Sequence, residues 1–134
     1  MVDIYKAFNV KDNKMASVLA VDDSKVMRDM MKVVLEKNGH TVQTAEDGFI
    51  ALDIAKSNRF DIVFTDINMP KMSGIALVPK LRELPGFEYI PILMVTTENA
   101  EYRKNKAKIN GATGWLEKPI SEARILKAMA KVLD

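Results

Sequence analysis

The sequence lacks cysteine altogether and contains a single histidine, His40. Without cysteine the chain forms no disulfide and offers no thiolate ligand for a metal. One histidine also excludes a multi-histidine metal site. A protein without disulfides is compatible with the reducing cytoplasm, and we therefore expect a cytoplasmic location.

Long hydrophobic runs and a large net charge are missing as well. No apolar run approaches the roughly 20 residues that a transmembrane helix needs, and the N-terminus lacks the apolar core of a signal peptide. The formal net charge of +2 is too small to indicate nucleic-acid binding. We therefore expect no membrane insertion and no DNA partner. A chain of 134 residues is long enough for one domain with a proper core.

From residue 17 onward, short apolar runs alternate with stretches of helical periodicity. The predicted strands are 17–21, 40–45, 61–66, 90–96 and 113–117, and the predicted helices are 24–39, 47–58, 74–84, 99–111 and 121–133. This alternation predicts an α/β fold, with a parallel sheet that carries helices on both faces. Residues 1–15 show no such period, so we predict an N-terminal extension or tail there and one domain over residues 16–134.

Two of the predicted helices depart from the regular pattern. Pro79 lies in the middle of 74–84, where it removes a backbone hydrogen bond and clashes with the preceding turn at a cost of about 3 kcal/mol. Either this helix starts late, with Pro79 near its first position, or it is kinked. The helix at 99–111 has few large apolar side chains, so we expect it to be among the looser elements.

Polar side chains gather at the ends of four predicted strands. Asp22 and Asp23 end the first strand, Asp66 ends the third, Thr96 ends the fourth and Lys118 follows the fifth. In open α/β sheets, ligands bind in the crevice outside the C-terminal ends of the strands. We therefore expect these five side chains to share one crevice.

The chemistry of these side chains suits a metal ion and a phosphoryl group. Three carboxylates in one crevice repel each other and need a cation, and oxygen ligands of this kind favour Mg²⁺ or Mn²⁺. Mg²⁺ often completes its shell with a phosphate oxygen, to which Lys118 and Thr96 could both bond. A carboxylate can itself act as a nucleophile and form an aspartyl phosphate, while a metal and a lysine offset the charge on the transferred oxygens.

Four segments carry a resemblance to a known family. The segments AVDDSKVMR (20–28), FTDINMPKMSG (64–74), LMVTTEN (93–99) and GATGWLEKPI (111–120) resemble the receiver domain of two-component response regulators, in particular the single-domain chemotaxis type. They occur in the family's order at four strand ends, and the resemblance covers about residues 17–133. It implies a flavodoxin-like, doubly wound (βα)5 fold with a five-stranded parallel sheet in the order 2-1-3-4-5.

The resemblance also implies a role for each residue of the acidic cluster. Asp66 corresponds to the phosphoacceptor, which also binds the metal. Asp23 corresponds to a direct Mg²⁺ ligand and Asp22 to one that acts through water. The backbone carbonyl of Asn68 would complete the metal site.

Three further residues receive roles from the resemblance. Thr96 would bond the phosphoryl group in the active state, and Lys118 would pair with it. Trp115 stands where the family usually has Tyr or Phe, the aromatic side chain that swings inward on activation. The bond between Lys118 and Pro119 falls where the family has a cis peptide.

The function implied by the resemblance is that of a stand-alone response regulator. It would accept a phosphoryl group from a histidine kinase onto Asp66 in a Mg²⁺-dependent reaction and switch protein contacts, in chemotaxis signalling. Such a protein is a signalling switch, which catalyses only its own phosphorylation and dephosphorylation. A phosphorelay intermediate, or a single-domain regulator outside chemotaxis, is the alternative within this class.

The downstream target would bind the face formed by the fourth helix, the fifth strand and the fifth helix. Basic side chains occur along these segments: Arg103, Lys104, Lys106, Lys108, Arg124, Lys127 and Lys131. They predict an acidic protein or peptide partner that favours the phosphorylated form and whose binding weakens with salt.

Other classes of function fit the residues less well. A phosphatase with an aspartate nucleophile needs Asp-x-Asp at the first strand end, where this chain has Asp22-Asp23-Ser24-Lys25. A flavin- or nucleotide-binding module needs a loop rich in Gly, Ser or Thr after that strand, and none is present. The intact set of Asp23, Asp66, Thr96 and Lys118 argues against a degenerate receiver that serves only protein contacts.

Overall fold

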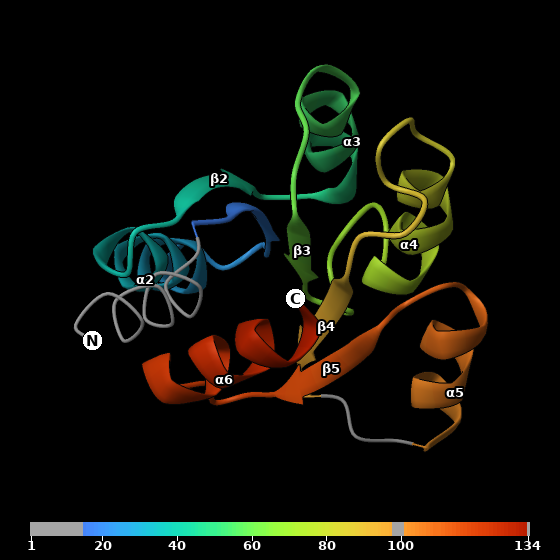
Figure 1. Ribbon diagram of the computed structural model, residues 1–134. Helices are drawn as coiled ribbons and strands as arrows, with labels where there is room; N and C mark the ends of the chain where they lie inside the picture. The colour runs from blue at the N-terminus through green and yellow to red at the C-terminus, as the bar shows by residue number, and fades with distance from the viewer. Residues whose placement is uncertain (1–14, 98–100, 134) are drawn as a thin grey trace.

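A computed structural model of the protein describes residues 15–97 and 101–133, apart from the side chains of Tyr102 and Ile109. Five parallel strands form one sheet in the order β2-β1-β3-β4-β5, with helices on both faces (Figure 1). The predicted flavodoxin-like architecture is therefore confirmed. Within the described residues, no helix is both long enough and apolar enough to cross a membrane.

The predicted strands and helices are all present. The strands are β1 (Ser17–Val21), β2 (Thr41–Ala45), β3 (Ile62–Thr65), β4 (Ile92–Thr96) and β5 (Gly114–Glu117). The helices are α2 (Lys25–Lys37), α3 (Gly48–Ser57), α4 (Gly74–Arg82), α5 (Glu101–Ile109) and α6 (Glu122–Val132). Of the predicted extension at 1–15, only the exposed Met15 lies within the described residues. The predicted start of the fourth helix at residue 99 also lies outside them.

The sheet separates two hydrophobic clusters, because successive side chains of a strand point to opposite faces. In β1, for example, Leu19 and Val21 belong to one cluster, and Val18 and Ala20 belong to the other. Helices α3, α4 and α5 cover the first cluster, and α2 and α6 cover the second (Figure 1). The central strands are therefore buried on both faces, which explains their nearly continuous apolar sequences.

Serine and aspartate side chains begin four of the helices. Each accepts a hydrogen bond from the backbone N–H three residues further on and so satisfies one of the free donors of the first turn. The capping residues are Ser24 of α2, Asp47 of α3, Ser73 of α4 and Ser121 of α6. Each cap sets where its helix starts relative to the preceding strand.

Pro79 lies inside α4, which already begins at Gly74 after the Ser73 cap. The alternative in which this helix starts late, with Pro79 near its first position, is therefore wrong. Pro79 removes the N–H that would donate to the carbonyl of Ile75. The buried side chains on either side of it keep the helix in place, because their burial outweighs one lost hydrogen bond; they are Ile75, Leu77, Val78 and Leu81.

The strand register aligns the C-terminal ends of the central strands. Val21 of β1 pairs with Thr65 of β3, so Asp22 and Asp66 leave the sheet at the same level. The N–H of Asp66 donates to the carbonyl of Val21 at 2.9 Å, which continues the ladder by one more residue. In the same way the N–H of Lys118 donates to the carbonyl of Thr96 at 2.9 Å. The predicted site residues are thus carried to one edge of the sheet.

Candidate functional site

Three aspartates meet at the C-terminal edge of the sheet. Asp22 and Asp66 follow the neighbouring strands β1 and β3, and Asp23 comes directly after Asp22. One carboxylate oxygen from each of the three aspartates lies within 4.8 Å of those from the other two. Asp22 and Asp66 are buried, whereas Asp23 is exposed. The predicted crevice therefore contains an acidic cluster with two buried carboxylates and one that faces solvent.

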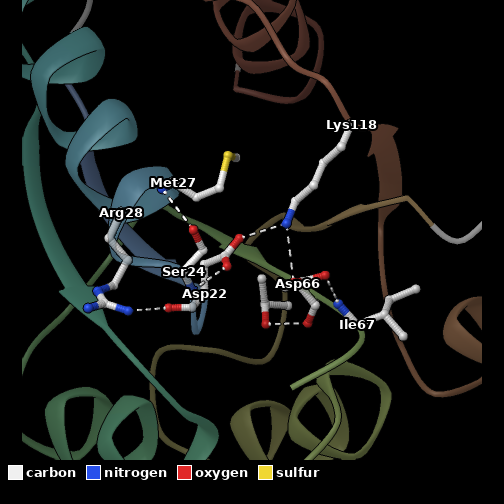
Figure 2. A network of polar contacts seen from close by, with 8 residues as sticks. Asp22, Ser24, Met27, Arg28, Asp66, Ile67 and Lys118 are labelled. Carbon is white, nitrogen blue, oxygen red and sulfur yellow. Dashed lines mark hydrogen bonds and ion pairs between the residues drawn. The ribbon is translucent and has the colours of Figure 1, made fainter. Parts of the chain in front are cut away.

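Lys118 supplies a cation to this cluster. It follows β5, which lies two strands away from β3, and its side chain reaches back to the aspartates (Figure 2). Its Nζ lies 3.1 Å from Oδ2 of Asp22 and 3.2 Å from Oδ2 of Asp66. Only 17% of the Lys118 side chain is exposed, so water screens these ion pairs much less than pairs on the surface.

Backbone groups hold the other oxygen of each buried carboxylate (Figure 2). The N–H of Ile67 donates to Oδ1 of Asp66 at 2.8 Å, and the N–H of Ser24 donates to Oδ1 of Asp22 at 2.9 Å. Arg28 donates from Nη1 to the carbonyl of Asp22 at 2.7 Å. Both carboxylates are thus oriented by the protein itself, with one oxygen on the backbone and the other on Lys118.

The electrostatic environment changes the proton affinity of Asp66 and Lys118. Burial raises the pKa of the Asp66 carboxyl, and the charge of Asp22 adds to the rise, while the Lys118 ammonium opposes it. Burial works to lower the pKa of Lys118, but its hydrogen bonds and charge interactions with Asp22 and Asp66 outweigh burial and raise it. Lys118 therefore stays a cation at neutral pH, and ionised Asp66 carries a free-energy cost that a further cation would offset.

The cluster fits a divalent cation. Its three carboxylates and one ammonium leave a formal excess of two negative charges. Carboxylate and carbonyl oxygens are the ligands that Mg²⁺ prefers, and the exposed position of Asp23 leaves room for the waters that Mg²⁺ retains. The residues present therefore fit the magnesium ion that the resemblance implies.

The loop between β3 and α4 folds back so that Gly74 lies close to the backbone of Asp66. A Cβ atom on Gly74 would lie 2.0 Å from the carbonyl oxygen of Asp66, so no other residue fits there without a backbone shift. The N–H of Gly74 donates to the carbonyl of Ile67 at 2.8 Å, and Lys71 has a positive φ of 73°. Asn68, the predicted carbonyl ligand, lies within this tight return.

Thr96 and the cis peptide also lie where the resemblance places them. Thr96 is buried at the end of β4, the strand between β3 and β5. The bond between Lys118 and Pro119 is cis, as predicted.

Trp115 lies in β5 opposite Met94 of β4. It is half-buried and packs against the hydrophobic cluster on the α3, α4 and α5 side of the sheet. The Nζ of Lys104 lies 4.2 Å from the centroid of its ring, a cation–π contact. The predicted switch aromatic, Trp115, is therefore in direct contact with α5.

Two contacts around the site were not anticipated from the sequence. Arg103 of α5 donates from Nη2 to Oδ1 of Asn68 at 3.2 Å. Lys71 pairs with Asp47 at 3.4 Å and so joins the loop below Asp66 to the start of α3. No local pattern signals either pair, because the partners are far apart in the sequence and are brought together only by the fold.

The family relationship agrees with this geometry. The sequence model of the response regulator receiver domain matches residues 18–130. The chain belongs to this family. Receiver domains are switches of two-component signalling rather than classical enzymes.

Similar receiver proteins span nearly the whole chain. Chemotaxis protein CheY-3 of Vibrio cholerae serotype O1 is 35% identical over 123 residues, which are 91% of this chain and 95% of CheY-3. Protein PilH of Pseudomonas aeruginosa is 36% identical over 119 residues, which are 89% of this chain and 98% of PilH. The solved structure of the chemotaxis protein CheY4 of Vibrio cholerae is 44% identical, with a TM-score of 0.86 over 89% of this chain and 99% of CheY4. This receiver domain therefore resembles these relatives over nearly their full length.

Proposed function

We propose that this receiver domain accepts a phosphoryl group from a histidine kinase onto Asp66 and thereby switches its protein contacts. The observation that carries this proposal is the joint position of Asp66, Lys118 and the two neighbouring aspartates. Asp66 lies 3.2 Å from a lysine cation and within 4.8 Å of the oxygens of Asp22 and Asp23. A buried nucleophile, a cation and ligands for a metal thus lie in one crevice.

In the proposed reaction, a carboxylate oxygen of Asp66 attacks the phosphorus atom of a phosphohistidine. The new oxygen–phosphorus bond forms as the nitrogen–phosphorus bond breaks, and the imidazole nitrogen keeps the electron pair of that bond. Lys118, already beside Oδ2 of Asp66, compensates charge on the transferred oxygens. The N–H of Ile67 keeps the other carboxylate oxygen oriented.

The metal of the proposed reaction is Mg²⁺ or Mn²⁺. Asp23, Asp66 and the carbonyl of Asn68 would hold it directly, and Asp22 would act through water. The bound ion would supply positive charge next to the phosphoryl oxygens.

The proposed response links the site to β4 and β5. Thr96 would bond the phosphoryl group in the active state, and Trp115 would move inward as the switch aromatic. Trp is larger than the usual Tyr or Phe, so its inward packing would be harder and incomplete. We propose that this response acts in cytoplasmic chemotaxis signalling, which the chemotaxis-named relatives support.

The proposed output surface is formed by α5, β5 and α6, and its partner is acidic. The seven basic residues of this surface differ in how far their side chains are exposed. Arg103 and Lys104 are only half-exposed, since the first bonds Asn68 and the second lies over Trp115. The exposed basic side chains of this surface are Lys106, Lys108, Arg124, Lys127 and Lys131.

Phosphotransfer from a panel of purified, phosphorylated histidine kinases tests the proposal. We expect at least one kinase to lose its phosphoryl group to the wild-type protein with Mg²⁺, and no transfer when a chelator removes the metal. Asp53→Asn is the matched control, because Asp53 is an exposed aspartate of α3. Transfer that proceeds equally well with the chelator would contradict the metal-dependent reaction.

A further inference from the structure

One side chain joins α5 to the loop that carries the predicted metal carbonyl. Arg103 lies in the first half of α5, and its Nη2 donates to Oδ1 of Asn68 at 3.2 Å. The two residues are 35 positions apart in the sequence, and Asn68 lies two residues after Asp66. This hydrogen bond therefore connects the acidic crevice directly to a helix of the proposed output surface.

The guanidinium of Arg103 is incompletely satisfied in this position. Among the described residues, its Nε is a buried side-chain nitrogen without a hydrogen-bond partner. A buried donor without an acceptor is unfavourable, and the amide oxygen that holds Nη2 is a neutral acceptor. Anionic oxygens form stronger, charge-assisted bonds with a guanidinium. An anion that arrives in the crevice would therefore compete with Asn68 for Arg103.

The next residue along α5 contacts the switch aromatic. Lys104 lies over the Trp115 ring, with 4.2 Å between Nζ and the ring centroid. Since adjacent helical residues point about 100° apart, Arg103 and Lys104 reach two different parts of the molecule from the same turn. A shift of α5 away from Asn68 would thus also change the position of a positive charge beside Trp115.

We propose that Arg103 transmits the state of the acidic crevice to α5. In the resting state its bond to Asn68 holds α5 against the loop below Asp66. When a phosphoryl group occupies Asp66, the guanidinium exchanges the amide oxygen for anionic oxygens, and α5 shifts with it. Arg103 is thus a positioning residue for the output helix. This inference rests on the proposed phosphorylation of Asp66.

Trp115 provides the measurement, because it is the single tryptophan of the chain. Its fluorescence is recorded before and after addition of Mg²⁺ and beryllofluoride, a mimic of the phosphoryl group. The variants are Arg103→Ala, Asn68→Ala, the double variant and Arg103→Lys. Lys106→Ala is the matched control, because Lys106 is an exposed lysine of the same helix. Direct Mn²⁺ binding is measured on each protein in parallel.

We expect the wild type and Lys106→Ala to change emission on addition of the mimic. Arg103→Ala and Asn68→Ala should each lose at least about three quarters of that change, because either variant releases α5 in the resting state. The double variant should lose no more than Arg103→Ala alone, since the two residues act as one contact. Arg103→Lys keeps the positive charge and should recover part of the response. Mn²⁺ binding should stay within about threefold in Arg103→Ala.

Two outcomes would overturn the inference. A full emission response in Arg103→Ala would show that α5 responds without this residue. An unchanged response in Asn68→Ala, beside a loss in Arg103→Ala, would show that Arg103 does not act through Asn68. Failure of the proposed function looks different, because the wild type itself would then neither bind Mn²⁺ nor respond to the mimic.

Discussion

At the residue scale, one lysine is shared by two buried aspartates. Lys118 lies about equally far from Asp22 and Asp66, and each aspartate keeps its second oxygen on a backbone N–H. The two buried carboxylates are thus held in fixed orientations, but the crevice still carries excess negative charge. The free energy of unfolding should therefore change when the lysine is removed and when a metal binds.

Replacement of Lys118 by alanine leaves two buried carboxylates without their shared cation. Removal of one partner of a buried ion pair costs about 3–5 kcal/mol in unfolding free energy, and the partial exposure of Lys118 favours the lower end. Mg²⁺ should restore a large part of this loss, since it supplies the missing charge. Urea unfolding with and without Mg²⁺ measures both effects. Lys80→Ala, at an exposed lysine of α4, is the control and should change neither value.

The raised pKa of Asp66 predicts a pH-dependent effect of Asp66→Asn. The folded state binds this proton more tightly than the unfolded state, so ionisation of Asp66 reduces stability as pH rises through its raised pKa. Asp66→Asn removes this cost and should unfold at higher urea concentration than the wild type near neutral pH. The gain should shrink as pH falls through the raised pKa towards the ordinary value of 3.8. A gain that grows on acidification would contradict the assignment.

At the scale of elements, the loop from β3 to α4 shapes the crevice. It returns so closely under Asp66 that Gly74 has no room for a side chain. Gly74→Ala should therefore lower the unfolding free energy by about 1–3 kcal/mol and weaken metal binding, because Asp66 must move.

Gly114→Ala is the matched control for this effect. A Cβ atom there would lie 3.6 Å from Leu93, an ordinary contact, and the backbone needs no positive φ. Urea unfolding and Mn²⁺ titration of both variants measure the difference. Equal stability and metal affinity of Gly74→Ala and the wild type would show that the loop tolerates a shift.

Much of the fold was predictable because its signals are local. The apolar run at 17–21 and the capping residue Ser24 mark a strand and the start of a helix without reference to the rest of the chain. Pro79 was harder to interpret. It signals a late start or a kink, and only the surrounding buried side chains determine that α4 begins at Gly74.

The candidate site was predictable in its residues but not in its connections. Asp22, Asp66 and Lys118 stand at strand ends, and strands of a parallel sheet end at one edge. The contacts of Arg103 with Asn68 and of Lys104 with Trp115 depend on how α5 is placed beside β5. No sequence period encodes that placement, which is a result of three-dimensional packing.

At the scale of the whole molecule, the strand order determines which elements can respond together. Because β4 lies between β3 and β5, Thr96 of β4 lies between Asp66 and Trp115 in the order of the strands. Helix α5 packs on the same side of the sheet as Trp115. The acidic crevice and the proposed output surface are thus connected through neighbouring elements.

The exposed basic side chains of the proposed output surface predict a partner whose binding weakens with salt. An acidic protein captured with Mg²⁺ and beryllofluoride should bind less well after Lys106→Glu and Lys108→Glu, by about tenfold for the pair, and less well at higher salt. Lys32→Glu, at an exposed lysine of α2 on the other face of the sheet, is the control. Pull-down and titration measure the change. A partner that requires beryllofluoride but binds equally well after both charge reversals would show that the output surface lies elsewhere.

The most direct test of the central claim is labelling by a small-molecule phosphodonor in the presence of Mg²⁺. The wild type and Asp53→Asn should each gain one acid- and base-labile phosphoryl group per chain, and peptide mapping should locate it on Asp66. Asp66→Asn should gain none. Equal labelling of Asp66→Asn and the wild type would contradict the account, because Asp66 would then not be the phosphoacceptor.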